Sequence, residues 1–332
     1  MQLNPTPTLI DTNPHFLALY THGPLPPDPS TPIILFLPGI ASSRLIWSGV
    51  LSRLPSTVRA YTYDRAGYGN SGRCTVPPNA ENIARDLAAL IRNADLANPI
   101  VLVGHSWAGV LIAEFLALTL GEDLDGQGKG KGKGEWESVN IAGVVLVDAN
   151  HEMTLQVLDP NDANLAALSR GVEQYTAKGI MAEHKLTDGE FNAFLADEST
   201  EEYILQAVKE EAEYVGSFAT LMKKELAARQ PLMGDKPVYV IGGSRERDWT
   251  KMMEAGIKRG NGTEEQRKRV RELIETADEK SAALMREHLK LSTRSKLVFT
   301  KESGHFVQLT EPDLVVDGIM WVLQELKGSY LT

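Results

Sequence analysis

The chain has 332 residues, enough for one large domain or for a core domain with an inserted one. Hydrophobic residues make up 42% of it and charged residues 23%, which is typical of a globular protein with a sizeable buried core. The formal net charge of −10 gives no general electrostatic support for binding nucleic acid, and the one cysteine, Cys74, excludes an internal disulfide and a cysteine-cluster metal site.

The N-terminal residues lack the basic and apolar regions of a secretory signal. No apolar run approaches the roughly 18 residues that a membrane helix needs. We therefore expect a soluble, cytoplasmic protein with no membrane partner.

Short runs of β-branched and aliphatic residues recur along the chain and predict strands. They lie at residues 16–22, 33–37, 59–63, 100–104, 143–147, 237–241 and 296–300. Several are apolar throughout, as parallel strands covered by helices on both faces are. Residues 80–94 and 108–120 have helical periodicity. This alternation predicts an α/β fold with a mostly parallel sheet and right-handed crossovers.

Three stretches interrupt the alternation. Residues 126–134, which contain only glycine, lysine and one glutamine, predict a flexible solvated connection rather than a basic binding loop. Residues 151–235 contain helix-like segments without a convincing strand and predict a helical cap inserted after the sixth strand. Residues 249–292 predict an additional helical excursion within the core. The core itself is expected to comprise residues 1–150 and 236–332.

The most informative segment is residues 101–109, where an apolar strand ends at Gly104 and a helical pattern opens just after Ser106. A serine on such a tight strand-to-helix turn has a strained backbone and an exposed hydroxyl, and the amides of the helix face any oxyanion beside it. The usual pattern is Gly-x-Ser-x-Gly, whereas here Ala108 takes the last position and Gly109 follows. Ser106 is a candidate nucleophile, and the alternative is a helix N-cap serine.

Two earlier segments strengthen a resemblance to the α/β-hydrolase superfamily. Residues 35–40 end a strand at the place where this superfamily forms half of its oxyanion hole, with Pro-Gly where many members carry His-Gly. The resemblance implies that the backbone N–H groups of Ile40 and Trp107 are the donors. Residues 63–71 resemble the Asp-Arg-x-Gly-x-Gly-x-Ser turn of the superfamily, and we expect an Asp64–Arg65 pair to hold that loop.

A histidine completes the pattern. His305 follows the last predicted strand, on a loop from which an imidazole can reach the serine and act as general base and then general acid. The chain order serine, acid, histidine is the one this superfamily uses. The resemblance therefore implies an eight-stranded, mostly parallel sheet flanked by helices, with a helical cap.

The acid that orients His305 is left open between two loops. Asp148 ends the sixth strand, a rigid platform for orientation. Asp248 follows the seventh strand, the commoner location in the superfamily, and Glu246 lies nearer the glycines of that loop. The sequence slightly favours Asp148 over Asp248, and both over Glu246.

These features predict a serine hydrolase that cleaves a carboxylic ester, lactone or thioester of a small molecule through an acyl-enzyme, without a metal or organic cofactor. The same residues are compatible with acyl transfer, carbon–carbon bond hydrolysis or a lyase reaction. A non-catalytic ligand-binding or interaction protein is the alternative of a different class. A nucleophilic serine argues against dehalogenase or epoxide hydrolase chemistry, in which related proteins use aspartate. Self-association into a homodimer is compatible with the sequence.

Overall fold

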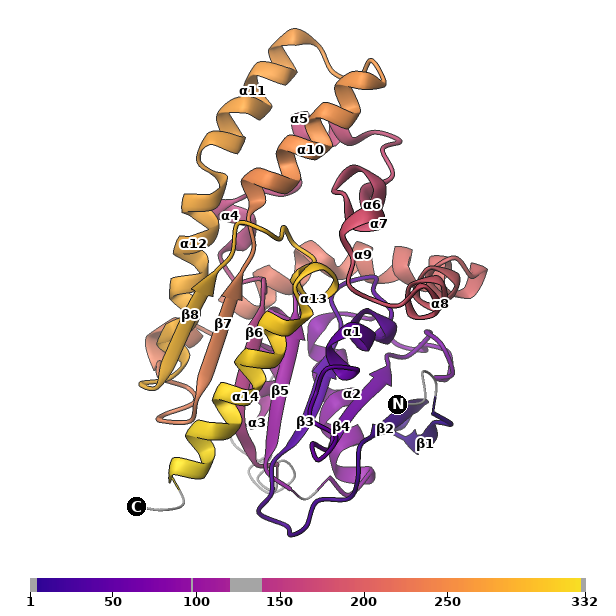
Figure 1. Cartoon of the computed structure of the whole chain (residues 1–332), viewed down its shortest axis with the longest axis vertical. Coiled ribbons are helices and arrows are strands. Elements are labelled where there is room, and N and C mark those ends of the chain that lie inside the picture. The colour runs from indigo at the N-terminus through magenta and orange to yellow at the C-terminus, as the bar shows by residue number, and fades with distance from the viewer. Residues whose placement is uncertain (1–4, 97, 120–138, 330–332) are drawn as a thin grey trace.

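The computed structural model describes residues 5–96, 98–119 and 139–329, and the statements below concern these. The predicted glycine–lysine connection at residues 126–134 lies outside them. The core is one eight-stranded sheet in the order β1-β2-β4-β3-β5-β6-β7-β8, with helices on both sides (Figure 1). The strands are β1 (Thr8–Asp11), β2 (Phe16–His22), β3 (Ile33–Leu37), β4 (Ala60–Asp64), β5 (Ile100–His105), β6 (Ile141–Val147), β7 (Val238–Gly242) and β8 (Ser295–Phe299).

This architecture confirms the predicted fold class. Strand β2 pairs antiparallel with β1 and β4, and every other pairing in the sheet is parallel. The seven predicted strands lie within two residues of their expected bounds. The eighth strand, β1, was not predicted. It is a four-residue edge strand in which one residue, Ile10, is buried, so it carries little hydrophobic pattern.

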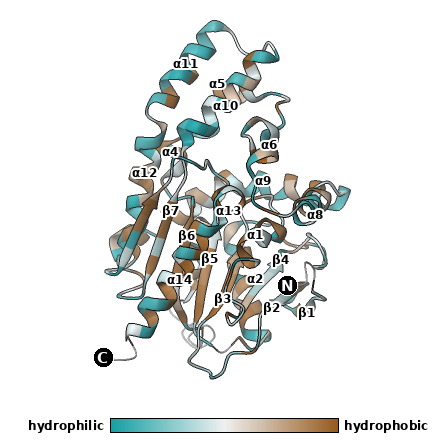
Figure 2. Cartoon of the chain, in the orientation of Figure 1, coloured by the Kyte–Doolittle hydropathy of each residue, from teal (hydrophilic) through white to brown (hydrophobic). Residues whose placement is uncertain are grey.

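The central strands are buried on both faces, because each face packs against helices. Alternate residues of β5 divide between two apolar clusters: Ile100 and Leu102 belong to one, Val101 and Val103 to the other. The first cluster includes α2 (Ala80–Asn93) and α3 (Ala108–Thr119). The second includes η1 (Arg44–Trp47), α1 (Ser48–Leu51), α13 (Val307–Thr310) and α14 (Pro312–Ser329). Figure 2 accordingly shows the central strands as the most hydrophobic elements.

The described residues between β6 and β7 form helices and no strand, consistent with the predicted cap segment. The elements are α4 (Thr154–Val157), α5 (Ala163–Ser169), α6 (Gln174–Ala177), α7 (Ile180–Glu183), α8 (Asp188–Glu198), α9 (Glu201–Met222) and η2 (Leu226–Arg229). Among the helices of the described residues, none has both the length and the apolar character needed to cross a membrane.

The excursion between β7 and β8 is also helical, and its first helices extend away from the sheet (Figure 1). It comprises α10 (Arg245–Lys258), α11 (Glu264–Glu275), α12 (Ala277–His288) and η3 (Leu289–Leu291). Helices α10 and α11 pack against α5 of the cap segment around a small apolar core. The two insertions thus contact each other through α5, α10 and α11, which the sequence did not indicate.

Asp64 and Arg65 hold the loops beside the serine turn, as expected, but through separate partners and not by pairing with each other. Successive residues at the end of a strand point to opposite sides, so these two side chains find separate partners. The Nε of Arg44 lies 3.1 Å from Oδ1 of Asp64. The Nε of Arg65 lies 2.7 Å from Oε1 of Glu210 on α9, and its Nη2 lies 2.8 Å from Oε2 of the same carboxylate.

Buried ion pairs therefore fasten α9 to the core. Glu210 and Arg65 are both fully buried, and Glu210 also accepts a hydrogen bond of 2.9 Å from the amide of Ala41. Just beyond α9, Lys224 pairs with the buried carboxylate of Glu114 on α3. Bidentate arginine–carboxylate contacts of this kind fix orientation as well as distance.

Replacement of Glu210 tests how strongly α9 is held. We expect Glu210→Ala to lower the free energy of unfolding by about 3–5 kcal/mol, because it leaves the Arg65 guanidinium buried without its counter-charge. Chemical denaturation measures the change. The control is Glu272→Ala, which removes a half-exposed contact of 3.1 Å with Arg269 and should cost less than about 1 kcal/mol. Equal effects of the two substitutions would contradict this account.

Candidate active site

Ser106 lies on a strained turn between β5 and α3. Its φ angle is +56°, a left-handed conformation that residues other than glycine rarely adopt. Its amide donates to the carbonyl of Val147 at 3.2 Å, and its own carbonyl accepts from the amide of Asn150 at 2.7 Å. These contacts with the end of β6 hold the turn in place and present the hydroxyl above the sheet edge.

The displaced glycine of the motif has a structural reason. A Cβ added to Gly104 would lie 2.6 Å from Cδ1 of Ile112 and 3.0 Å from Cβ of Ala108, so the strand and the helix approach each other closely at that position. A Cβ added to Gly109 would lie 2.3 Å from the carbonyl oxygen of Asn150. The close approach to the β6 loop thus occurs at Gly109, and Ala108 is accommodated.

His305 lies on the loop that joins β8 to α13. Its imidazole ring lies between the side chains of Ser106 and Asp148. Its Nε2 is 2.9 Å from Oγ of Ser106, and its Nδ1 is 2.6 Å from Oδ2 of Asp148. A carboxylate only accepts hydrogen bonds, so Nδ1 carries the proton and Nε2 accepts from the serine hydroxyl. The structure therefore brings together the two residues singled out as nucleophile and base.

Asp148 is fully buried at the end of β6. Its φ of +41° is unusual, and the neighbouring strand β7 holds it there. The amide of Gly243 donates to its Oδ1 at 3.1 Å, and Nη2 of Arg245 lies 2.8 Å from its Oδ2. The carboxylate thus has partners for both oxygens besides His305.

The other two candidate acids do not contact the imidazole. The Oδ2 of Asp248, which is also buried, accepts a hydrogen bond of 2.9 Å from the main-chain amide of His305. Glu246 is exposed on the first turn of α10. The sequence therefore identified two carboxylates beside His305, of which Asp148 meets the ring and Asp248 meets the backbone.

His105 completes the support of His305. Its Nε2 lies 2.9 Å from the carbonyl oxygen of His305, and the two ring centroids are 4.5 Å apart. A carbonyl only accepts, so Nε2 of His105 is the protonated nitrogen. Burial lowers the pKa of His105 well below its usual range, which is consistent with a neutral ring. Both main-chain groups of His305 are thus fixed.

The pKa of His305 is also held well below its usual range. Burial is the main cause, because the imidazolium would lose hydration. The positive charges of Arg245 and Lys178 lower it further. Lys178 follows α6, and its Nζ lies 4.0 Å from Oδ2 of Asp248.

Two main-chain amides belong to segments next to the serine, that of Ile40, which lines the same cavity, and that of Trp107, the next residue in the chain. The loop after β3 approaches so closely that a Cβ on Gly39 would be 3.0 Å from Cβ of Ser106. Within the part of the chain that the structure describes, neither amide is hydrogen-bonded. Trp107 immediately precedes the N-terminus of α3, where amides face outward.

A cavity of about 160 Å³ opens beside the serine. Its walls come from the core, the cap segment and α10, and they are formed by Ile40, Ser106, Asn150, Thr154, Leu158, Pro160, Tyr214, Arg245, Trp249 and His305. The Oδ1 of Asn150 accepts from the Tyr214 hydroxyl at 3.2 Å. Among the described residues, no three His, Cys, Asp or Glu side chains converge as a metal site requires. Sequence reasoning missed Asn150, Tyr214 and Arg245, which stand in no recognisable local pattern.

Known proteins share both the sequence family and the fold. A protein of Gibberella zeae described as an AB hydrolase superfamily protein is 27% identical over 307 residues, which are 91% of this chain and 89% of that protein. A probable transporter of Hormonema carpetanum, efuK, is 28% identical over 97% of this chain, but the match spans 43% of its own length. An esterase from Thermogutta terrifontis, solved with malate bound, is similar in fold, with a TM-score of 0.56 at 17% identity over 97% of this chain and 99% of that chain.

A family model described as the alpha/beta hydrolase family matches residues 34–318, from the second residue of β3 to within α14. The match includes the segments that carry Ile40, Ser106, Asp148 and His305. Because it spans most of the chain, this protein belongs to the alpha/beta hydrolase family.

Proposed function

We propose that this protein is a serine hydrolase that cleaves a carboxylic ester, lactone or thioester of a small organic molecule through an acyl-enzyme. The observation that carries the proposal is the continuous chain of hydrogen bonds from Ser106 through His305 to Asp148, with distances of 2.9 and 2.6 Å. The serine end of this chain borders a cavity, and the aspartate end is buried in the sheet.

In the first half of the reaction, His305 Nε2 takes the proton of Ser106 as Oγ forms a bond to the carbonyl carbon of the substrate. The negative charge that develops on the carbonyl oxygen is stabilised by the amides of Ile40 and Trp107, which make no hydrogen bond to any other group among the described residues. Asp148 stabilises the imidazolium and keeps Nε2 directed at the serine.

In the second half, the bond from the carbonyl carbon to the leaving group breaks, and His305 donates its proton to that group. The alcohol or thiol departs, or stays attached in the case of a lactone, and the acyl group remains on Ser106. His305 then takes a proton from water, whose oxygen attacks the acyl carbon. Collapse of this second intermediate releases the acid and restores the Ser106 hydroxyl.

Arg245 adapts this site to a neutral base. Its guanidinium lies 2.8 Å from Oδ2 of Asp148, the same oxygen that accepts the hydrogen bond from Nδ1 of His305. It therefore offsets part of the negative charge that would favour the imidazolium. His305 then remains unprotonated, and able to accept the serine proton, to a lower pH than an isolated imidazole.

The cavity supports a small substrate. A cavity of about 150 Å³ holds a benzene molecule, so 160 Å³ accommodates on the order of six non-hydrogen atoms. Apolar walls at Leu158 and Trp249 suit a hydrocarbon or aromatic part. Tyr214 and Asn150 offer polar contacts near the serine.

A fluorophosphonate probe tests the nucleophile. The native protein should be labelled on Ser106, because the probe captures serines that an adjacent base has activated. Ser106→Ala and His305→Ala should each abolish labelling and ester hydrolysis, measured by mass spectrometry and with a panel of acyl esters, lactones and thioesters of graded length. Absence of labelling under conditions that modify a control esterase would contradict the proposal.

Paired substitutions separate the roles of the two aspartates. We expect Asp148→Asn to lower kcat about 10³–10⁴-fold, because an amide favours the wrong histidine tautomer. Asp248→Asn should lower kcat less than about tenfold, because its amide oxygen still accepts from the His305 backbone. Steady-state kinetics on one ester substrate distinguishes them. A larger loss from Asp248→Asn would reverse the assignment.

The pH profile tests Arg245. Removing its positive charge stabilises the imidazolium, so Arg245→Gln should raise the pKa of His305 and move the acid limb of kcat/KM upward by about one pH unit. Arg247→Gln is the matched control, since Arg247 lies on the same helix but pairs with Glu183. If the acid limb of kcat/KM stays at the same pH in Arg245→Gln, the arginine does not set the protonation of His305.

A further inference from the structure

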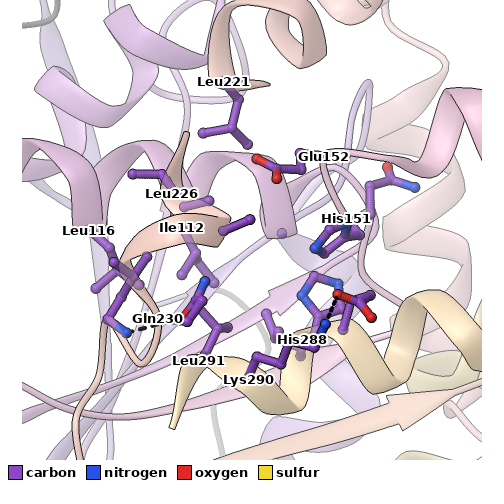
Figure 3. A pocket seen from close by; sticks show the side chains of 17 residues that line it. Ile112, Leu116, His151, Glu152, Leu221, Leu226, Gln230, His288, Lys290 and Leu291 are labelled. Carbon is purple, nitrogen blue, oxygen red and sulfur yellow. Dashed lines mark hydrogen bonds and ion pairs between the residues drawn. The ribbon is translucent and has the colours of Figure 1, made fainter. Parts of the chain in front are cut away.

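A second cavity lies behind the nucleophile helix. It has a volume of about 80 Å³ and is enclosed by α3, the loop after β6, the end of the cap segment and the α12–η3 region (Figure 3). Neither Ser106 nor His305 lines it. Asn150 borders both this cavity and the one beside the serine.

One side of the second cavity is aliphatic. In Figure 3, Leu116, Ile112 and Leu226 lie on this side, and Leu221 and Leu291 close it from two further directions. All five are buried. Such a surface favours a hydrocarbon chain, since each methylene transferred from water is stabilising.

The opposite side is polar and contains two neutral histidines (Figure 3). His151 Nδ1 accepts from the amide of Met153 at 3.2 Å, so its proton is on Nε2. His288 Nε2 lies 3.2 Å from the carbonyl oxygen of Ala149, so its Nδ1 is an acceptor. Burial lowers the pKa of His151 and lowers that of His288 to about 3. The two rings therefore present one donor nitrogen and one acceptor nitrogen.

Glu152 adds a carboxylate to the polar side. Within the described residues it has neither a hydrogen bond nor an ion pair, and burial raises its pKa. Lys290, the cation on the same wall, is engaged at 2.6 Å by the carboxylate of Glu287. The carboxylates of Glu152 and Glu287 outnumber the ammonium group of Lys290 on this wall, so the wall disfavours an anionic ligand. The polar end instead suits a neutral group that both donates and accepts.

We propose that this second cavity binds a short primary aliphatic alcohol. The hydroxyl donates to Glu152 and accepts from Nε2–H of His151, while the chain packs against the aliphatic side. A cavity of about 150 Å³ holds a benzene molecule, so 80 Å³ accommodates about three to four non-hydrogen atoms. That size corresponds to ethanol and n-propanol. The site is independent of whether Ser106 is catalytic.

NMR titration with n-alkanols tests the site. The δ-methyl resonance of Ile112, assigned with Ile112→Val, should shift on addition of methanol, ethanol, n-propanol and n-butanol. We expect Kd to fall about threefold to fourfold for each added methylene, until the chain fills the cavity. Absence of a saturable shift with all four alcohols would overturn the proposal.

Variants locate the ligand and its head group. Ala113→Phe, which fills the cavity from α3, should abolish the shift while the rest of the methyl spectrum keeps its folded dispersion. Glu152→Ala should weaken binding at least fivefold, whereas Glu246→Ala, at an exposed glutamate outside both cavities, should not change it. Ser106→Ala should bind as the native protein does. Binding that Ala113→Phe leaves intact, or tighter binding of n-alkylammonium ions than of alcohols, would contradict the assignment.

Discussion

The hydrogen bond between His305 and Asp148 is the contact around which this site is organised. Asp148 follows a fully buried strand, and the segment after β7 supplies the Gly243 amide and, at the start of α10, the Arg245 guanidinium that hold its carboxylate. His305 is fixed in turn through its main chain, by Asp248 at the amide and His105 at the carbonyl. One aspartate therefore orients the ring and the other positions the loop, a division that gives each carboxylate a separate function.

The fold was largely predictable because its strands are buried. Runs such as 33–37 and 141–147 are apolar throughout, and only parallel strands covered on both faces require that. Strand β1 escaped prediction because an edge strand needs so little apolar surface. The helical character of both insertions was also evident from the sequence. Their packing of α5 against α10 and α11 was not, because contacts between distant segments leave no local periodicity.

The candidate site was predictable where its residues stand in a turn of characteristic pattern. Ser106 and His305 each lie shortly after an apolar strand, with a glycine one or two residues before them. Their loops could therefore be identified. The acid could not be decided from the sequence, because Asp148 and Asp248 both lie beside His305. They differ only in whether they contact its ring or its main-chain amide. Arg245 left no sequence signal, since an arginine after an N-cap serine is ordinary on any helix.

The buried ion pairs along α9 have a consequence for how substrates enter. An opening motion that carried α9 away from the core as a rigid body would have to separate Glu210 from Arg65 and Lys224 from Glu114. Helix α9, which contributes Tyr214 to the cavity wall, is therefore tied to the core by two buried ion pairs. The other cap residues of that wall, Thr154, Leu158 and Pro160, lie in and just after the short helix α4. Selection among substrates would rest on the fixed dimensions of the cavity rather than on closure around the bound molecule.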